Sequence, residues 1–336
     1  MSNKIERIKA LLAGERVHPP VASFFGHKHA LEQSPETLVP HLIEQNKLFG
    51  WDFIKVQSRA TYYGEAWGCE HIFDAQQGPV MVDHVIKDAA DYFTLPKLDI
   101  TQGPLAEHVR VAEGLAADID DGTPHVHTVF APLTILNRLG GAQRRTEDET
   151  NRLRVEIEQH PDAIRAGLET VTATLVEFVR ALIRAGGDGI FITTTGWDAD
   201  HFAPDLYREW AEPYERRLFE AARDEGAWLN IIHACRAHTH FDIVKDYPVE
   251  VISYDALSGR NPTIAEAREL TDKVLWSGID IQTLASGDVE KLRDEVSAAR
   301  DASQQWERLI LGPTCAVPPS ADPDLLHEVR RLSSEQ

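Results

Sequence analysis

In the stretch Ile231-Ile232-His233-Ala234-Cys235, an apolar run ends in a histidine and a cysteine two positions apart. Side chains at positions i and i+2 of a strand point to the same face. A strand over this stretch therefore places His233 and Cys235 side by side at its carboxyl end. A second apolar run, residues 309–311, leads to Cys315 in a similar way.

These three residues are candidate ligands of one metal ion. Imidazole and thiolate are ligands that zinc favours, and three protein ligands leave one coordination position open, as in a catalytic zinc site. A structural zinc is usually closed by four protein ligands. The alternative is that Cys235 and Cys315 are small buried hydrophobes and His233 is a satisfied polar group. The proline-rich loop 312–319 around Cys315 favours the metal site, whereas Cys69 has no neighbour at ligand spacing and is expected to be structural.

Length, composition and charge restrict the class of protein. The 336 residues, 43% of them hydrophobic, can fill a sizeable core. The chain has 34 basic and 54 acidic residues, and its net charge of −20 argues against nucleic acid or anionic membranes as partners. No apolar run approaches the ~20 residues of a membrane helix, and the N-terminus lacks the apolar core of a signal peptide, so we expect a cytoplasmic protein. Three cysteines do not make a disulfide framework.

Strand and helix patterns alternate along the chain. The expected strands are 19–25, 53–57, 125–130, 189–195, 231–235, 249–255, 273–278 and 309–315. Eight such units favour a (β/α)8 TIM barrel over a doubly wound sheet, and no glycine-rich phosphate-binding fingerprint indicates a dinucleotide domain. We expect one α/β domain over residues 1–336, with an N-terminal helix in 1–16 and an excursion over one end of the barrel in 70–122.

Polar residues gather where the expected strands end, and barrel enzymes carry their chemistry at that rim. The candidates for substrate binding are His27, Lys55, Gln57, Tyr63 and Trp197. Each of these residue types is individually more common in an ordinary loop or core.

Asp255 is the candidate catalytic residue. It follows the strand after His233, and a ligating histidine normally donates its second ring nitrogen to a fixed partner. An ordinary capping role is the alternative for this aspartate.

Four segments make the chain resemble the uroporphyrinogen decarboxylase superfamily over nearly its whole length. They are 53–57 (FIKVQ), 62–68 (YYGEAWG), 185–190 (AGGDGI) and 311–319 (LGPTCAVPP). Within it the chain is similar to the methylcobamide:coenzyme M methyltransferases, (β/α)8 barrels marked by a His-x-Cys and a distant Cys as zinc ligands. His233, Cys235 and Cys315 match that signature. Cobalamin-independent methionine synthase is similar too, and Asp255 lies near the place of its acidic ligand, with Asp for the usual Glu.

The resemblance implies zinc-dependent methyl transfer between a corrinoid on a partner protein and a thiol or small methylated substrate. A homodimer is compatible with it. The alternatives are a metal-free decarboxylase-like lyase acting on a carboxylated substrate, and a non-enzymatic subunit that binds a corrinoid or a partner. The loop 26–29 has no arginine, where the decarboxylase holds its substrate with arginines, and this departure disfavours the lyase. Arg236 follows Cys235 where the methyltransferases usually have glycine, so coenzyme M is not assumed as the thiol.

Overall fold

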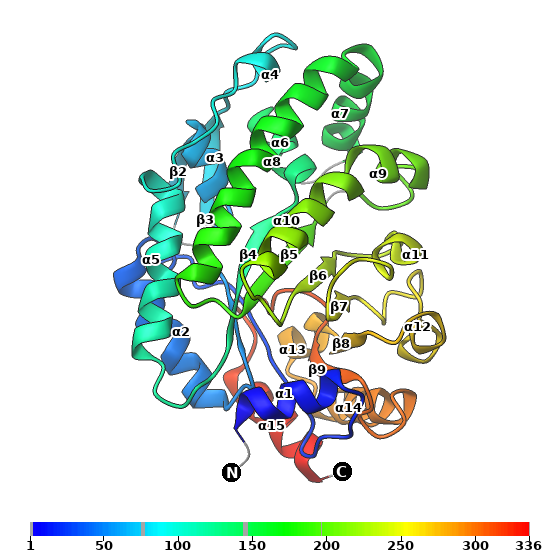
Figure 1. Ribbon diagram of the computed structural model, residues 1–336. Coiled ribbons are helices and arrows are strands. Elements are labelled where there is room, and N and C mark those ends of the chain that lie inside the picture. The colour runs from blue at the N-terminus through cyan, green and yellow to red at the C-terminus, as the bar shows by residue number, and fades with distance from the viewer. Residues whose placement is uncertain (1–2, 75–77, 144–146, 196, 336) are drawn as a thin grey trace.

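Seven parallel strands form one curled sheet in the order β1-β4-β5-β6-β7-β8-β9 (Figure 1). The computed structural model describes residues 3–74, 78–143, 147–195 and 197–335. The strands are β1 Ile54–Val56, β4 His125–Phe130, β5 Gly189–Thr194, β6 Ile231–Ala234, β7 Val251–Tyr254, β8 Val274–Ile279 and β9 Leu309–Pro313. Every neighbouring pair is parallel. The predicted α/β class and parallel sheet are therefore confirmed, and the fold is TIM-barrel-like.

The expected strand over residues 19–25 is not a continuous strand. Isolated parallel bridges join Ala22 to Leu311 and Gly26 to Val317, so this segment runs beside β9. The main sheet of the described residues thus has seven strands and a bridging segment, and the prediction of a fully closed eight-stranded barrel is only partly correct.

The residue types in segment 19–25 explain why it does not form a full strand between β9 and β1. Pro19 and Pro20 have no amide hydrogen to give to a ladder. On the side of β1, the Ser23 hydroxyl donates to the carbonyl of Phe53 at 2.8 Å, in the place of a backbone amide. Farther along this seam lies a cavity of about 120 Å³, and Lys55 is part of its wall.

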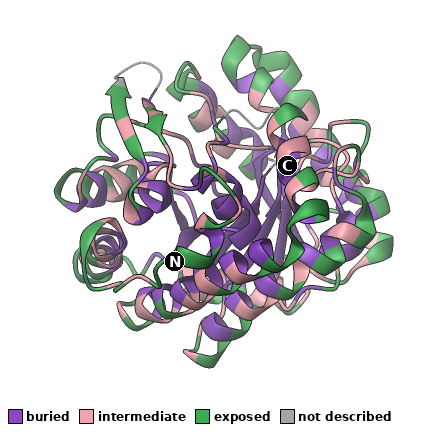
Figure 2. Ribbon diagram, turned by 90° about the horizontal axis from the view of Figure 1, so that it is seen from above, coloured by how far each residue is buried: buried purple, intermediate pink, exposed green. Residues whose placement is uncertain are grey.

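Helices cover the outer face of the sheet (Figures 1 and 2). The longer ones are α2 Pro35–Phe49, α5 Gly103–Asp118, α7 Glu147–Gln159, α8 Pro161–Arg184, α10 Glu212–Asp224, α14 Val289–Ala302 and α15 Pro323–Glu335. The shorter ones are α3 Tyr62–Trp67, α4 Asp91–Thr94, α6 Pro132–Leu139, α9 Pro204–Trp210, α11 Phe241–Val244, α12 Ile264–Leu270 and α13 Ile281–Ser286. No helix among the described residues has the length and apolarity needed to span a membrane.

The segment 70–122 contains an antiparallel hairpin, β2 Glu70–Asp74 and β3 Gly78–Asp83, followed by α4 and α5. Helix α5 packs against α2 and α8, so it belongs to the outer helical layer.

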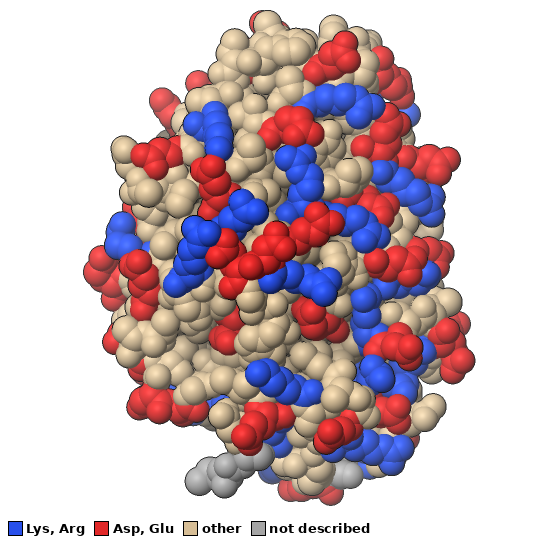
Figure 3. Space-filling model, viewed as in Figure 1, with Lys and Arg blue, Asp and Glu red and all other residues tan. Residues whose placement is uncertain are grey.

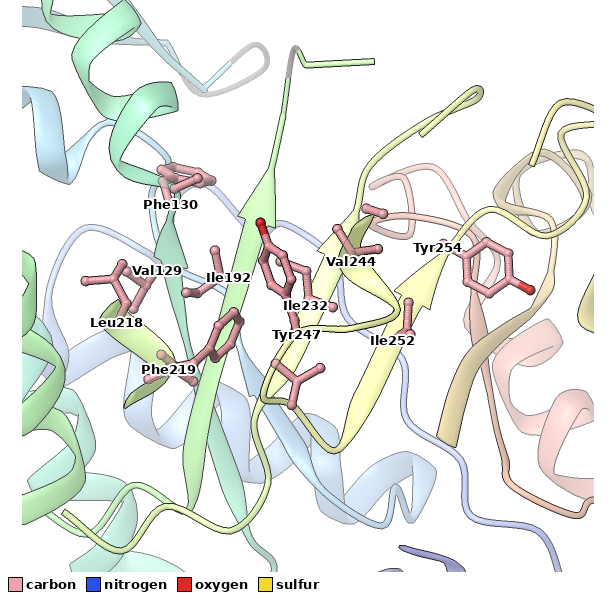
Figure 4. Close-up of a cluster of buried hydrophobic side chains, with 14 of the residues drawn as sticks. Val129, Phe130, Ile192, Leu218, Phe219, Ile232, Val244, Tyr247, Ile252 and Tyr254 are labelled. Carbon is pink, nitrogen blue, oxygen red and sulfur yellow. The ribbon is translucent and has the colours of Figure 1, made fainter. Parts of the chain in front are cut away.

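Alternation along the strands divides the core into two parts. Outward side chains such as Ile192 and Ile232 pack with Leu218 and Phe219 of α10 (Figure 4). Inward side chains form a separate apolar cluster, which also contains Ile8 of the N-terminal helix α1 (Lys4–Leu12). In Figure 1, α1 and both termini lie at one end of the molecule. Acidic and basic side chains are interspersed over the face shown in Figure 3.

Asp52 ties the two ends of the chain to the seam. Its carboxylate accepts hydrogen bonds from Arg7 Nε at 2.9 Å and from Arg330 Nη2 at 2.7 Å. It also accepts from the amide of Ala22 at 2.9 Å. The Asp52 side chain is 4% exposed, so these bonds are made in a largely dry environment. One carboxylate therefore holds α1, α15 and the bridging segment together.

We predict that Asp52→Ala lowers the free energy of unfolding by about 3 kcal/mol, because a buried carboxylate is removed and two arginines lose their partner. Urea denaturation of the full chain measures this change. Asp120→Ala is the matched control: Asp120 pairs with Lys47 on the surface, and its loss is expected to cost under about 1 kcal/mol. Equal midpoints for Asp52→Ala and the native chain would contradict the proposed role.

Candidate metal centre

The three predicted ligands meet at one point. His233 lies on β6, Cys235 directly follows it, and Cys315 follows β9. The two Sγ atoms are 4.0 Å apart, and Cys315 Sγ is 3.9 Å from His233 Nε2. All three ligand atoms lie within 4.8 Å of one another. Tetrahedral zinc with ordinary bond lengths separates two sulfurs by about 3.8 Å and a sulfur and a nitrogen by about 3.6 Å. The two measured separations lie within a few tenths of an ångström of these values, so the donor set fits a zinc ion.

Ser253 orients the imidazole of His233. The two residues are register partners in the parallel pair β6 and β7, so their side chains share the inward face. His233 Nδ1 lies 2.9 Å from Ser253 Oγ. With Nδ1 as the hydrogen-bond donor, Nε2 keeps its lone pair and faces Cys315. Phe191 stacks on the His233 ring with centroids 5.2 Å apart and planes 23° apart, and this contact further limits rotation of the ring.

The prediction that His233 donates a hydrogen bond to Asp255 is wrong. Asp255 lies beyond the end of β7, and its Oδ1 accepts the amide of Leu257 at 3.0 Å. Ser253 takes the expected place because it is the residue directly opposite His233 in the register. Burial raises the pKa of the Asp255 carboxyl, and the nearby charge of Cys315 adds to this effect. A catalytic role for Asp255 stays a prediction.

The groups around Cys315 favour ionisation of its thiol. The hydrogen bond with Cys235 is the largest influence and lowers the pKa of the Cys315 thiol, against the opposing effect of burial. The contact with His233 lowers it further. A thiol that gives up its proton readily binds a metal cation without a large protonation cost.

The loop after Cys235 is held by a residue that the sequence did not single out. Arg236 and His238 both adopt positive φ, 73° and 54°, which is strained for residues with side chains. Asn261 Nδ2 donates to the carbonyls of Arg236 at 2.8 Å and Asp255 at 3.0 Å, while its Oδ1 accepts the amide of Thr239 at 2.8 Å. Asn261 thereby joins the loops that follow β6 and β7. No local sequence motif predicts this role of Asn261, because its hydrogen-bond partners lie in other segments.

Three of the predicted substrate-binding residues lie in one row. The Lys55 ammonium sits over the faces of Phe25 and Phe191, 4.3 and 4.6 Å from the ring centroids, and it hydrogen-bonds to Gln57. Gln57 Nε2 in turn contacts His27 Nε2. Burial lowers the pKa of Lys55 to about 7, although the nearby charge of Cys315 opposes this shift. Phe25, His27, Lys55 and Gln57 border the cavity at the seam.

The other two predicted substrate-binding residues lie in the apolar core. The Tyr63 hydroxyl donates to the carbonyl of Thr128 at 3.3 Å, and Trp197 Nε1 donates to Thr134 Oγ1 at 2.9 Å. Both rings are buried within the cluster between sheet and helices. The hydrogen bonds of Tyr63 and Trp197 thus go to Thr128 and Thr134, and a role of either residue in substrate binding stays a prediction.

Known proteins of two kinds are similar in sequence. A uroporphyrinogen decarboxylase from Rhodococcus opacus is 29% identical over 236 residues, which cover 68% of this chain and 62% of that protein. The methylcobamide:CoM methyltransferase MtbA from Methanosarcina mazei is 19% identical over 210 residues, which cover 62% of this chain and 59% of that protein. The matched regions thus span about three fifths of these relatives' own lengths.

The fold is shared with solved structures. A methyltransferase from Methanosarcina mazei superimposes with a TM-score of 0.82 at 18% identity, over 99% of this chain and 98% of the other. A B12-independent methionine synthase from Shewanella gives a TM-score of 0.59 at 13% identity, over 94% and 95% of the two chains. Residues 27–335 match the family model described as uroporphyrinogen decarboxylase (URO-D). The chain therefore belongs to the uroporphyrinogen decarboxylase family.

Proposed function

We propose that this protein is a zinc-dependent methyltransferase that moves a methyl group between a corrinoid on a partner protein and a thiol or small methylated substrate. The observation that carries the proposal is the convergence of His233, Cys235 and Cys315 on one centre. Similarity to methylcobamide:CoM methyltransferases supports the reaction class. The corrinoid partner, the small-molecule substrate, a cytoplasmic location and a homodimer stay predictions.

The residues of the centre have separable tasks. When bound, Zn2+ supplies Lewis acidity that keeps a substrate thiol in its nucleophilic thiolate form. Cys235 and Cys315 as thiolates would balance the charge of a bound dication. Ser253 holds the imidazole of His233 in the ligating tautomer. Asn261 fixes the strained loop that begins directly after Cys235.

In its protonated form, Lys55 places a positive charge beside the two thiols. Its ammonium interacts electrostatically with both Cys235 and Cys315. It lies against the rings of Phe25 and Phe191, which keep water from this part of the barrel interior. A cation at this position favours an anionic substrate group at the centre and offsets the excess negative charge.

A metal-free lyase is the second candidate, favoured by the 29% identity to the Rhodococcus opacus uroporphyrinogen decarboxylase. Such an enzyme needs cationic side chains free to hold carboxylates. Arg59 follows β1, but its guanidinium is 2.9 Å from Glu65 and 2.8 Å from Glu107. Its positive charge is thus already balanced. Chelator treatment separates the candidates, because a metal-free lyase keeps its activity when zinc is removed.

We predict that Cys235→Ser loses stoichiometric zinc and lowers methyl transfer by more than about 100-fold, because one of three ligands is removed. Metal analysis of the purified chain measures the zinc. Transfer is measured from free methylcobalamin to a panel of small thiols.

Cys69→Ser is the matched control, since Cys69 is buried in the core between sheet and helices. It is expected to retain zinc and activity. Full zinc in Cys235→Ser, or activity that survives complete chelation, would defeat the ligand assignment.

We predict that Ser253→Ala weakens zinc binding by about 10-fold to 100-fold, because His233 loses the partner that fixes its tautomer. Competition with a chromophoric chelator gives the affinity. Ser277→Ala is the control, since Ser277 is also a buried strand serine, but its hydroxyl accepts the amide of Ala256. Equal zinc affinities in the two variants would show that Ser253 does not orient the ligand.

A further inference from the structure

A second cluster of metal-ligating side chains lies on the segment that bridges the seam and on the loop after it. His27 Nδ1 is 3.0 Å from each carboxylate oxygen of Glu32, and His29 Nδ1 is 3.5 Å from Glu32 Oε2. The three ligand atoms lie within 4.8 Å of one another. The Glu32 side chain is 1% exposed, so its carboxylate is removed from solvent.

We propose that His27, His29 and Glu32 form a second metal site, which binds a first-row divalent transition-metal cation of the class of Zn2+ and Co2+. The proposal is independent of the methyl-transfer function, because it uses none of the three ligands of the first centre. Two imidazoles and one carboxylate are a donor set that such cations accept, while Mg2+ and Ca2+ prefer oxygen ligands alone.

The distances suit an ion placed between the three side chains. With metal–ligand bonds of about 2.1 Å, tetrahedral coordination separates neighbouring donor atoms by about 3.4 Å. The two contacts of 3.0 and 3.5 Å from the imidazoles to Glu32 bracket that value. The rings of His27 and His29 are stacked, with centroids 4.9 Å apart and planes 24° apart. Both Nδ1 atoms therefore turn toward the same carboxylate.

The neighbours of His27 and Glu32 fix their orientation. Gln57 Nε2 contacts His27 Nε2 and lies 3.3 Å from His27 Nδ1, so Gln57 packs along one side of the His27 ring. The amide of Lys28 donates to Glu32 Oε1 at 2.8 Å and holds the carboxylate in place. A hydrogen bond of this kind to a ligating carboxylate is typical of metal sites.

A hydrogen-bonded cluster without a metal is the competing interpretation, and His29 argues against it. Its Nδ1 is buried but has no hydrogen-bond partner anywhere in the described part of the chain. The Glu32 carboxylate thus forms a hydrogen bond with the imidazole of His27 and none with the imidazole of His29. A cation between the three groups would satisfy all of them, which explains why His29 is held 3.5 Å from Glu32 rather than turned away.

The cluster also faces free volume that can admit an exogenous ligand. A cavity of about 180 Å³ is lined by His27, His29, Thr61 and His71. Both ring nitrogens of His71 are buried and lack hydrogen-bond partners within residues 3–74, 78–143, 147–195 and 197–335. A three-ligand site beside this cavity would have room for water or a small anionic ligand, with His71 available to contact it.

The test is Co2+ titration of the metal-free full chain, with stoichiometry from metal analysis and the ligand type from optical spectra. We expect two equivalents in the native chain, one of them with a sulfur-to-cobalt charge-transfer band. The double variant Cys235→Ser/Cys315→Ser should keep one equivalent and lose the band. Adding His29→Ala to that double variant should weaken the remaining binding by at least about tenfold.

Two further variants keep the test decisive. Glu32→Gln preserves the shape of the cluster and should weaken the same equivalent at least about tenfold, which covers the case in which His29→Ala misfolds. His201→Ala is the matched control, since the imidazole of His201 pairs with Asp198 and its loss should not change Co2+ binding.

The outcomes separate the two proposals. If Cys235→Ser/Cys315→Ser binds no Co2+, or if neither His29→Ala nor Glu32→Gln weakens its binding, the second site is refuted. A native chain without the sulfur-to-cobalt band would instead refute the thiolate centre and leave the second site standing.

Discussion

The alternation of side chains along parallel strands is the constraint on which the metal centre depends. On β6 the inward positions run from Ile231, in the apolar interior, through His233 to Cys235 at the strand end. The parallel register then sets Ser253 of β7 directly beside His233. A shift of one residue in that register would point Ser253 away from the barrel interior and leave the imidazole without its partner. The geometry of the ligand is therefore a consequence of backbone pairing.

The seam between β9 and β1 connects both candidate metal sites to the ends of the chain. The bridge from Gly26 to Val317 fixes the loop that carries Cys315 beside the residue that precedes His27. Only glycine permits this contact, because a Cβ atom at position 26 would lie 2.6 Å from the carbonyl oxygen of Val317. Asp52 anchors the start of the same segment through Arg7 and Arg330. The contacts along this seam thus also position the segments that carry Cys315 and His27.

The sequence predicts well what depends on local periodicity. The spacing of His233 and Cys235 follows from the strand period, and the seven strands of the sheet were predicted from their apolar runs. The partner of His233 was not predictable in this way, since a sequence does not state the register between two strands. The burial of Tyr63 and Trp197 was not predictable for a related reason: a polar aromatic side chain in a loop-like stretch can turn toward a site or into the core, and tertiary packing decides which.

Membership of the uroporphyrinogen decarboxylase family defines the scaffold but not the reaction, because one barrel can carry different chemistry at its rim. Two basic side chains near the rim are already engaged: Arg59 is balanced by Glu65 and Glu107, and Lys55 lies buried against the rings of two phenylalanines. The rim is rich in soft and borderline metal ligands, with two thiols and several imidazoles. A site built from such donors activates sulfur more readily than it binds carboxylates, and on this ground we rank methyl transfer above decarboxylation.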